Sequence, residues 1–270
     1  MRRGRGRATV RRAATLALVA AAVAAVLSAR EPDLAPGPAA AHLGVPALPA
    51  PPEPAFRVGA PLPPRHGEHE FRWTPVRRAV AVRADPDPAA RVLTRIGTRT
   101  PEGTTNIALA LDRMTGADGR LWVRVRLAIL PNGSTGWVPR AALGGYGTVR
   151  TRLIVDRARL SATLLRDERP ILKAPIGIGA AGSPTPAGEF YVRNRLTRYR
   201  SPFYGPVAFG TSARSPTLTD WPDGGFVGIH GTNRPDLVPG RVSHGCIRLH
   251  IADVRRLARL MPIGTPLTIR

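Results

Sequence analysis

The sequence predicts a mainly β protein with one short helix near its C-terminal end. Short runs of alternating apolar and polar residues recur from about residue 71 onward, and Gly- and Pro-containing turns separate them. Residues 252–260 form the one good helical pattern, with apolar positions near one face and arginines near the other. Short strands at this spacing favour a β-sandwich or β-barrel over alternating β-α-β units.

Residues 1–30 have the layout of a secretory signal. Six arginines lie among the first twelve residues, and an uncharged, mostly aliphatic run follows over residues 13–29. Export with cleavage near residue 29 is the favoured interpretation. A retained membrane anchor is the alternative, because the run is at the short limit for spanning a bilayer. Either way, we expect the protein in the cell envelope, on the outer side of the membrane.

Residues 31–70 are expected to form a linker. Eleven prolines fall between residues 31 and 65, and no apolar periodicity supports a core.

The formal net charge of the chain is +22, a balance that often indicates nucleic-acid binding. The export signal argues against nucleic acid, so acidic envelope polymers are the expected counter-surface. A compositional bias toward arginine explains the charge equally well.

Residues 71–147 change in character. Residues 76–82 and 121–127 alternate as strands do, a Pro-Asn-Gly turn follows, and Gly136-Trp137-Val138 reads as a further strand. This arrangement resembles the end of a bacterial SH3-like barrel, which predicts a small SH3-like β-barrel here. Trp122 and Trp137 either fill its core or stack on sugar or peptide, and the core is favoured.

Residues 148–270 are expected to form a second domain. Strands are predicted at residues 152–156, 160–165, 170–178, 189–192 and 265–269. The helix over residues 252–260 carries Asp253 in its first turn, where the helix dipole favours negative charge.

Cysteine occurs once in the chain, in the run Ser243-His244-Gly245-Cys246-Ile247-Arg248. A lone cysteine cannot form a disulfide within its own chain, and flanking histidine and glycine make it a candidate nucleophile. A free thiol is mostly protonated at neutral pH, so it needs a base. His244 would lie on the same face as Cys246 if the segment were a strand. His230 reaches it only if the fold joins the two loops. Taken alone, the cysteine reads as a small buried core residue.

Three segments carry a resemblance to a known family: Ile229-His230-Gly231-Thr232-Asn233, Ser243-His244-Gly245-Cys246-Ile247-Arg248-Leu249 and Thr185-Pro186-Ala187-Gly188-Glu189-Phe190. Together they resemble the L,D-transpeptidase family with its YkuD-type catalytic domain. The resemblance spans nearly all of residues 148–270. It implies an L,D-transpeptidase-type β-sandwich with the site in a groove.

The resemblance also implies roles for residues. Cys246 would be the nucleophile and His230 the base that activates it, with the backbone carbonyl of Gly231 orienting the imidazole. No metal or organic cofactor is implied.

The residues around the cysteine have implied roles as well. His244 would line the site, and Ser243 and Arg248 would support the loop and the substrate. The N–H groups of His244, Gly245 and Cys246 would hold the oxyanion.

The segment before His230 offers three further residues for the predicted site. Tyr204, Trp221 and Phe226 would form a flap over the peptide groove, with ordinary loop packing as the equal alternative.

The implied reaction is the cross-linking of peptidoglycan stem peptides between two diamino acids, with release of D-alanine. Water as acceptor would make the protein an L,D-carboxypeptidase, and a non-catalytic wall-binding protein is a further alternative. We expect a monomer whose thiol is a carbapenem target. A fragment of residues 148–270 is expected to keep the thiol chemistry, because every candidate catalytic residue lies within it.

Overall fold

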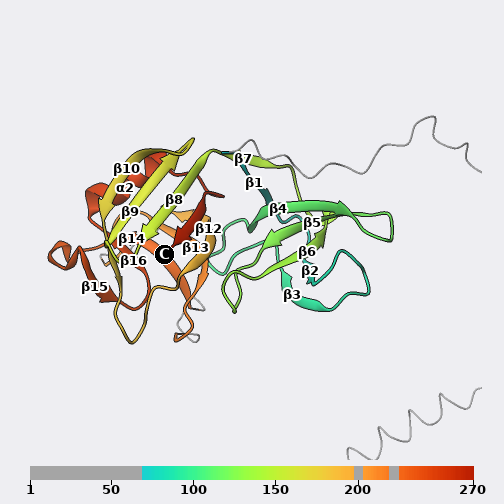
Figure 1. The fold of residues 1–270 in the computed structure, drawn as a ribbon, viewed down its shortest axis with the longest axis horizontal. Coiled ribbons are helices and arrows are strands. Elements are labelled where there is room, and N and C mark those ends of the chain that lie inside the picture. Colours follow the sequence, from blue (N-terminus) through green and yellow to red (C-terminus); the bar gives the residue numbers. More distant parts are fainter. Residues whose placement is uncertain (1–68, 198–202, 219–224) are drawn as a thin grey trace, which may run out of the picture. The chain divides into compact units, whose positions relative to one another are not determined.

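The structure is a computed structural model that describes residues 69–197, 203–218 and 225–270 (Figure 1). The predicted signal, nearly all of the predicted linker and Trp221 lie outside these residues. The described chain forms two β-sheets with one α-helix and two short 3-10 helices, so it is mainly β as predicted. None of its helices has the length and apolar character needed to cross a membrane.

The first sheet has seven strands, all paired antiparallel, in the order β3-β2-β6-β5-β4-β1-β7. Its elements are β1 (Phe71–Pro75), β2 (Val80–Arg83), β3 (Val92–Ile96), β4 (Ile107–Thr115), β5 (Leu121–Arg126), β6 (Thr135–Pro139), the 3-10 helix η1 (Arg140–Ala142) and β7 (Gly147–Val149).

The predicted strands over residues 121–127 and 136–138 are confirmed as β5 and β6. The predicted strand over residues 76–82 is only half right, since just residues 80–82 belong to a strand. The backbone N–H groups of Arg77 and Arg78 both donate to the carbonyl of Ala142, which draws the chain away from the sheet between β1 and β2.

The core of this sheet is built from small and branched apolar side chains on its strands. Trp122 is 1% exposed, which confirms the packing interpretation for that residue. Trp137 is half-buried, and the guanidinium of Arg124 lies 5.9 Å from its ring centroid. Strands β3 and β7 form the two edges of the sheet. The SH3-like assignment of this sheet stays a prediction.

The second sheet has ten strands in the order β10-β9-β8-β17-β12-β13-β14-β16-β11-β15. Its elements are β8 (Thr151–Asp156), β9 (Ser161–Arg166), β10 (Arg169–Pro175), β11 (Gly177–Gly179), β12 (Gly188–Leu196), β13 (Ala208–Arg214), β14 (Phe226–Gly231), the 3-10 helix η2 (Pro235–Leu237), β15 (Gly240–Ser243), β16 (Ile247–Leu249), the helix α2 (Ile251–Leu260) and β17 (Pro266–Ile269).

Strand β12 joins the two halves of this second sheet. Its first residues pair with β17 and its later residues pair with β13. One apolar core packs side chains from both halves, such as Leu164 and Ile229, against Val254 and Leu257 of α2. Burial of such side chains is the main stabilising contribution to a fold of this kind. The two halves therefore enclose a single interior.

The predicted elements of this half are largely confirmed. Helix α2 begins one residue before the expected start. The expected strand over residues 170–178 is two strands, because Ile176 leaves the ladder and its N–H donates to the carbonyl of Leu160. The predicted domain boundary between residues 147 and 148 falls inside β7, which pairs with β1 of the first sheet.

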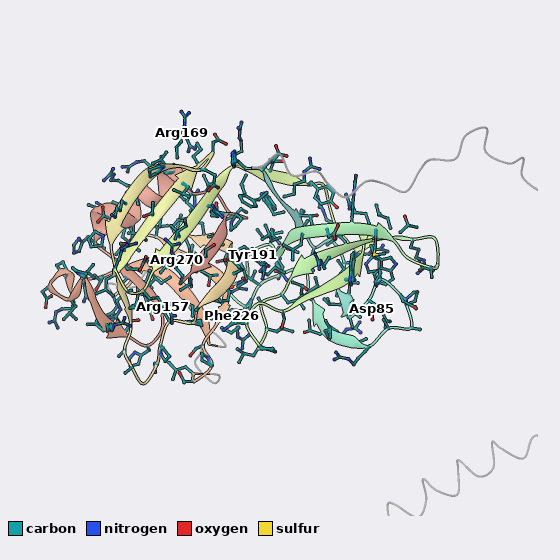
Figure 2. The ribbon with its side chains drawn as sticks, in the orientation of Figure 1. Asp85, Arg157, Arg169, Tyr191, Phe226 and Arg270 are labelled. Carbon is teal, nitrogen blue, oxygen red and sulfur yellow. The ribbon has the colours of Figure 1, made fainter. Side chains whose placement is uncertain are left out.

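A small apolar cluster connects the two sheets. Tyr191 of β12, labelled in Figure 2, packs with Ile107 and Leu109 of β4. Its hydroxyl donates to the carbonyl of Ile107 at 2.9 Å. Burial raises the pKa of Tyr191 to about 12, so the hydroxyl keeps its proton and remains a donor at neutral pH.

Candidate active site

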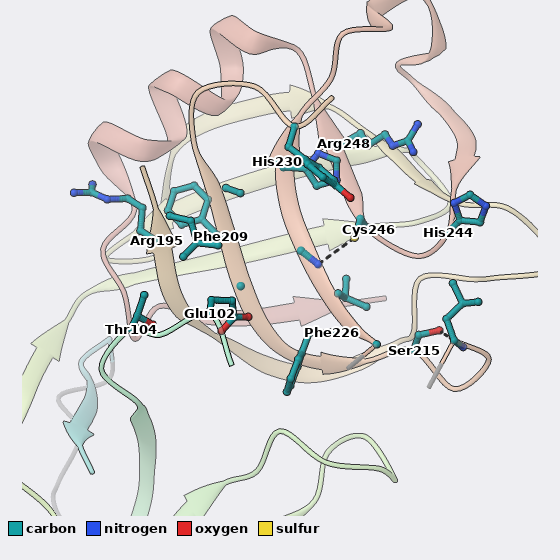
Figure 3. A pocket seen from close by; sticks show the side chains of 18 of the residues that line it. Glu102, Thr104, Arg195, Phe209, Ser215, Phe226, His230, His244, Cys246 and Arg248 are labelled. Carbon is teal, nitrogen blue, oxygen red and sulfur yellow. Dashed lines mark hydrogen bonds between the residues drawn. The ribbon is translucent and has the colours of Figure 1, made fainter. Parts of the chain in front are cut away.

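Two neighbouring strands bring the predicted histidine and cysteine together. Strands β14 and β16 run parallel, with Ile229 opposite Ile247 and His230 opposite Arg248. Cys246 immediately precedes β16. His230 and Cys246 both line one cavity of about 780 Å³ (Figure 3). His230 and Cys246 are sixteen positions apart in the sequence, and the pairing of β14 with β16 brings them together, as the sequence-based prediction for His230 required.

The segment around the cysteine is a turn and not a strand. Residues 244–246 lie between β15 and β16, so the argument that places His244 beside Cys246 by strand alternation is wrong. Gly245 has a φ of 114°, a backbone conformation that side-chain-bearing residues rarely adopt. His244 is exposed, and Figure 3 shows it on the side of Cys246 opposite to His230 in that view.

Buried hydroxyls hold this turn in place. Ser243 Oγ donates to the carbonyl of Cys246 at 2.6 Å and accepts from the N–H of Gly245 at 3.1 Å. Thr185 Oγ1 donates to the carbonyl of Gly245 at 2.7 Å and accepts from the N–H of Gly179 at 2.9 Å. The predicted loop-supporting role of Ser243 therefore has a physical basis, and Thr185 supplies a second support that sequence reasoning did not assign.

The same contacts bear on the predicted oxyanion donors. In this conformation the N–H of Gly245 is directed at Ser243 Oγ and not at the cavity. Because one N–H makes one good hydrogen bond, the prediction that Gly245 supplies an oxyanion donor is not supported by this arrangement.

His230 is buried, with 3% of its surface exposed. Its Nδ1 lies 2.6 Å from the carbonyl oxygen of Gly231. A carbonyl only accepts hydrogen bonds, so Nδ1 carries the proton and the lone pair is on Nε2. Burial lowers the pKa of His230 to about 4; the hydrogen bond to Gly231 opposes this shift, and the positive charge of Arg248 adds to it. The imidazole is therefore neutral at pH 7.

Tyr204 borders this histidine. Its ring meets that of His230 edge to face, with centroids 4.4 Å apart. Its carbonyl accepts from the N–H of Gly231. Phe226 is part of β14, and the guanidinium groups of Arg193 and Arg214 lie 3.8 and 4.3 Å from its ring centroid. Phe226 therefore lies in a strand and not in a loop, and it also lines the cavity, so its flap role stays a prediction.

Gly228 is a functional candidate that sequence reasoning missed. Its N–H donates to Cys246 Sγ at 3.3 Å, drawn as a dashed line in Figure 3. A Cβ at this position would lie 3.7 Å from Cys246 Sγ and 3.8 Å from His230 Cδ2, so the thiol and the imidazole border the same point. A backbone donor leaves no mark in a sequence beyond the glycine itself.

The cavity extends well beyond the thiol. Arg248 and Arg195 give it positive charge, while Glu102, Gly103 and Thr104, in the loop between β3 and β4, line it as well. Nothing in the sequence pattern connects residues 102–104 with the cysteine motif, so sequence analysis did not find them. In the described ranges no cluster of three histidine, cysteine, aspartate or glutamate side chains is arranged to hold a metal ion.

Comparison with known proteins places the C-terminal part of the chain in a family. The model of the YkuD family, the L,D-transpeptidase catalytic domain, matches residues 150–269. The putative L,D-transpeptidase YkuD of Bacillus subtilis is 35% identical over 122 residues, which cover 45% of this chain and 67% of that protein. The putative L,D-transpeptidase YqjB of Bacillus subtilis is 31% identical over 125 residues, which cover 43% of this chain and 69% of that protein.

Solved structures of L,D-transpeptidases are also similar to part of the chain. The catalytic domain of an E. faecium L,D-transpeptidase, determined by NMR, is 27% identical, with a TM-score of 0.34 and coverage of 44% of this chain and 96% of that one. The Ldtfm–avibactam carbamoyl enzyme is 28% identical with a TM-score of 0.35, and the match spans about half of that chain (48%). The sequence matches over residues 150–269 show that the chain belongs to the YkuD family, whose defining unit is the L,D-transpeptidase catalytic domain.

Proposed function

We propose that this protein is an exported peptidoglycan L,D-transpeptidase that uses Cys246 as its nucleophile. The observation that carries the proposal is the tautomer of His230. Its Nδ1 proton is held by the carbonyl of Gly231, which leaves the lone pair on Nε2, and His230 and Cys246 line the same cavity. A neutral imidazole with a fixed tautomer beside a half-buried thiol is the arrangement that nucleophilic cysteine catalysis needs.

The first half of the reaction is acyl transfer to the enzyme. His230 Nε2 takes the thiol proton, and Cys246 Sγ attacks the carbonyl carbon of the diamino acid in a donor tetrapeptide stem. The C–N bond to the terminal D-alanine breaks as the imidazolium returns its proton to the leaving amine. A thioester remains on Cys246. The N–H of Gly228 supports this step, because a donor aimed at sulfur stabilises its negative charge.

The second half returns the thiol. The side-chain amine of a diamino acid in an acceptor stem attacks the thioester carbonyl and gives its proton to His230. The C–S bond breaks, and the proton returns to the sulfur. The product is a cross-link between two diamino acids, of the 3-3 type. With water in place of the amine, the same steps yield a tripeptide, which is the carboxypeptidase alternative.

Other residues complete the proposal. Arg248 and Arg195 both line the cavity and give it positive charge, which suits peptides that carry free carboxylates. Tyr204 packs the edge of His230 and borders the same cavity, as a substrate-contacting residue would. We also propose substrate contacts for Trp221 and a site-lining role for His244. The leader-like residues 1–30 support an envelope location, with a membrane tether if the segment is retained.

Mass spectrometry of muropeptides tests this function. The protein without residues 1–30 is incubated with purified tetrapeptide stems, and its Cys246→Ala variant is the matched control. Dimers that have lost one D-alanine are expected with the wild-type cysteine and not with the variant. If tripeptides form without dimers, the acceptor is water and the protein is an L,D-carboxypeptidase. Identical products from both proteins would rule out the thiol mechanism, and no product from either would favour the non-catalytic wall-binding alternative.

A further inference from the structure

We propose that the first sheet supplies one wall of the peptide-binding cavity and thereby determines which stem peptides bind. The wall is the Glu102 loop, defined as residues 97–106 between β3 and β4. Glu102, Gly103 and Thr104 of this loop line the same cavity as His230 and Cys246. The peptide nature of the ligand rests on the proposed function, whereas the wall itself rests on the contacts below.

The Glu102 loop is ordered by its own hydrogen bonds. The hydroxyls of Thr100 and Thr104 lie 2.8 Å apart, and the N–H of Gly103 donates to the carbonyl of Thr100 at 2.9 Å. The side-chain amide of Asn106 donates to the carbonyl of Gly97 at 2.8 Å, which closes the base of the loop. A loop held in this way presents a formed surface, so little entropy is lost when a ligand binds to it.

The loop is anchored to β12 by a buried ion pair. Glu102 Oε1 accepts from Arg193 at 2.8 Å, and the two side chains are 13% and 3% exposed. Asn194 Nδ2 donates to Glu102 Oε2 at 3.1 Å and to Thr104 Oγ1 at 3.0 Å. Both carboxylate oxygens therefore have partners, as a buried charge requires.

The first sheet grips β13 at a second point. Asn132, in the turn between β5 and β6, donates to the carbonyl of Arg214 at 2.7 Å, and its Oδ1 accepts from the N–H of Arg214 at 2.9 Å. One amide side chain thus binds both backbone groups of a single residue, in the manner of a neighbouring strand. The first sheet is consequently held by two separate contacts, one from the Glu102 loop to β12 and one from the Asn132 turn to β13.

Short contacts lead from this wall to the nucleophile. Arg193 Nε donates to the carbonyl of Thr211 at 2.8 Å, and Thr211 Oγ1 donates to the carbonyl of Val227 at 2.6 Å. The next residue, Gly228, donates to Cys246 Sγ. The wall and the thiol are therefore parts of one continuous hydrogen-bonded framework, and a peptide reacting at Cys246 has the Glu102 loop within the same cavity.

Gly103→Asn tests the wall directly. The φ of Gly103 is +77°, which asparagine tolerates better than most residues, and no atom lies within 4 Å of a Cβ there. The added side chain should occupy cavity space without disturbing the fold. Gly119→Asn is the matched control: its φ is +73°, its surroundings are equally open, and it does not line the cavity.

Binding is measured by calorimetry with a purified tetrapeptide stem, with all variants in the Cys246→Ala background. We expect Gly103→Asn to weaken binding about tenfold and Gly119→Asn to leave it unchanged. In the background that retains Cys246, both variants should be alkylated by iodoacetamide at the wild-type rate, because the small reagent does not need the wall. Unchanged stem affinity in Gly103→Asn, or an equal loss in Gly119→Asn, would overturn the proposal.

The outcome is separable from that of the proposed function. If the stem binds, Gly103→Asn weakens its binding and the wild-type protein forms no product, the wall is supported and the transferase activity is refuted. If product forms and Gly103→Asn binds as well as wild type, the activity stands and the wall is refuted. A stem that does not bind the Cys246→Ala protein at all refutes the wall as a peptide-binding surface.

Discussion

Burial has two opposite effects on a histidine that serves as a base, and both apply to His230. Burial keeps the imidazole neutral and therefore available to accept a proton, but a pKa of about 4 also makes it a weak acceptor. Proton transfer from the thiol then depends on how well the sulfur's negative charge is stabilised. The Gly228 N–H aimed at Sγ provides stabilisation at the required place. Base and donor are thus expected to act together.

The pH dependence of stability should report this buried histidine. A histidine has a pKa near 6.5 in the unfolded chain and about 4 here, so between these values the unfolded state binds a proton that the folded state does not. Stability from this source is complete above pH 6.5 and falls as the pH drops toward 4. In urea unfolding from pH 7.5 to 4.5, the His230→Gln variant should lose less stability than the wild type. Parallel pH profiles for the two proteins would contradict the assignment.

The two histidines of the site should differ in their effects on catalysis. His230→Ala removes the base and should slow stem-peptide turnover by about 10²- to 10⁴-fold. His244→Ala removes an exposed side chain in a turn that Ser243 and Thr185 hold through other atoms, so the loss should be smaller. Rates of thiol alkylation and of turnover are compared for both variants. A larger loss from His244→Ala would reverse the two roles.

At the scale of elements, the pairing of β14 with β16 creates the site. Parallel pairing puts His230 opposite Arg248, so the residue before β16 comes to lie beside Gly228. The Glu102 loop then adds a contact from a different sheet, 91 residues away in the chain from its partner Arg193. The motifs around His230 and Cys246 can be recognised in the sequence, but the strand pairing and the Glu102–Arg193 contact that complete the site cannot.

The buried ion pair between the sheets should be more important for stability than an exposed one. Glu102→Ala leaves the guanidinium of Arg193 buried without its carboxylate, a change that typically costs about 3–5 kcal/mol. Asp236→Ala breaks the exposed pair with Arg234 and should leave stability unchanged, because water and salt screen that pair. Urea denaturation of both variants measures the difference. Similar losses from the two substitutions would show that Arg193 finds another partner.

At the scale of the whole molecule, the sequence predicted what depends on local pattern. Alternation identified β5, short runs beside turns identified β6, β8 and β9, the helical period identified α2, and the motifs around His230 and Cys246 indicated the family. Sequence patterns gave wrong predictions where hydrogen bonds and backbone conformation of the folded chain determine the local structure. The carbonyl of Ala142 accepts hydrogen bonds from Arg77 and Arg78 and so interrupts the expected strand after Val76. The turn at Gly245 removes the strand alternation that would have put His244 beside Cys246. The cavity wall at Glu102 was out of reach because its partner lies in another sheet.

The structure changes the expected behaviour of the isolated fragment of residues 148–270. Removing the first sheet exposes Tyr191, leaves Arg193 without its carboxylate and splits β7 from β1. We therefore expect this fragment to unfold at a lower urea concentration than the protein without residues 1–68. Where it remains folded, its thiol should still be alkylated while its affinity for stem peptides falls. A fragment as stable as the longer protein would show that the two sheets fold independently.

The contact between Glu102 and Arg193 has a consequence for inheritance and for engineering. Catalytic domains are often treated as modules that can be moved between proteins and joined to different partners. Here an exchanged N-terminal sheet would need to bring a carboxylate for Arg193 and an amide in the place of Asn132, or the recipient would carry a buried charge without a counterion. The two halves are therefore expected to be inherited together. Chimeras that keep the Glu102 loop and the Asn132 turn should be more stable to urea than chimeras joined at residue 147.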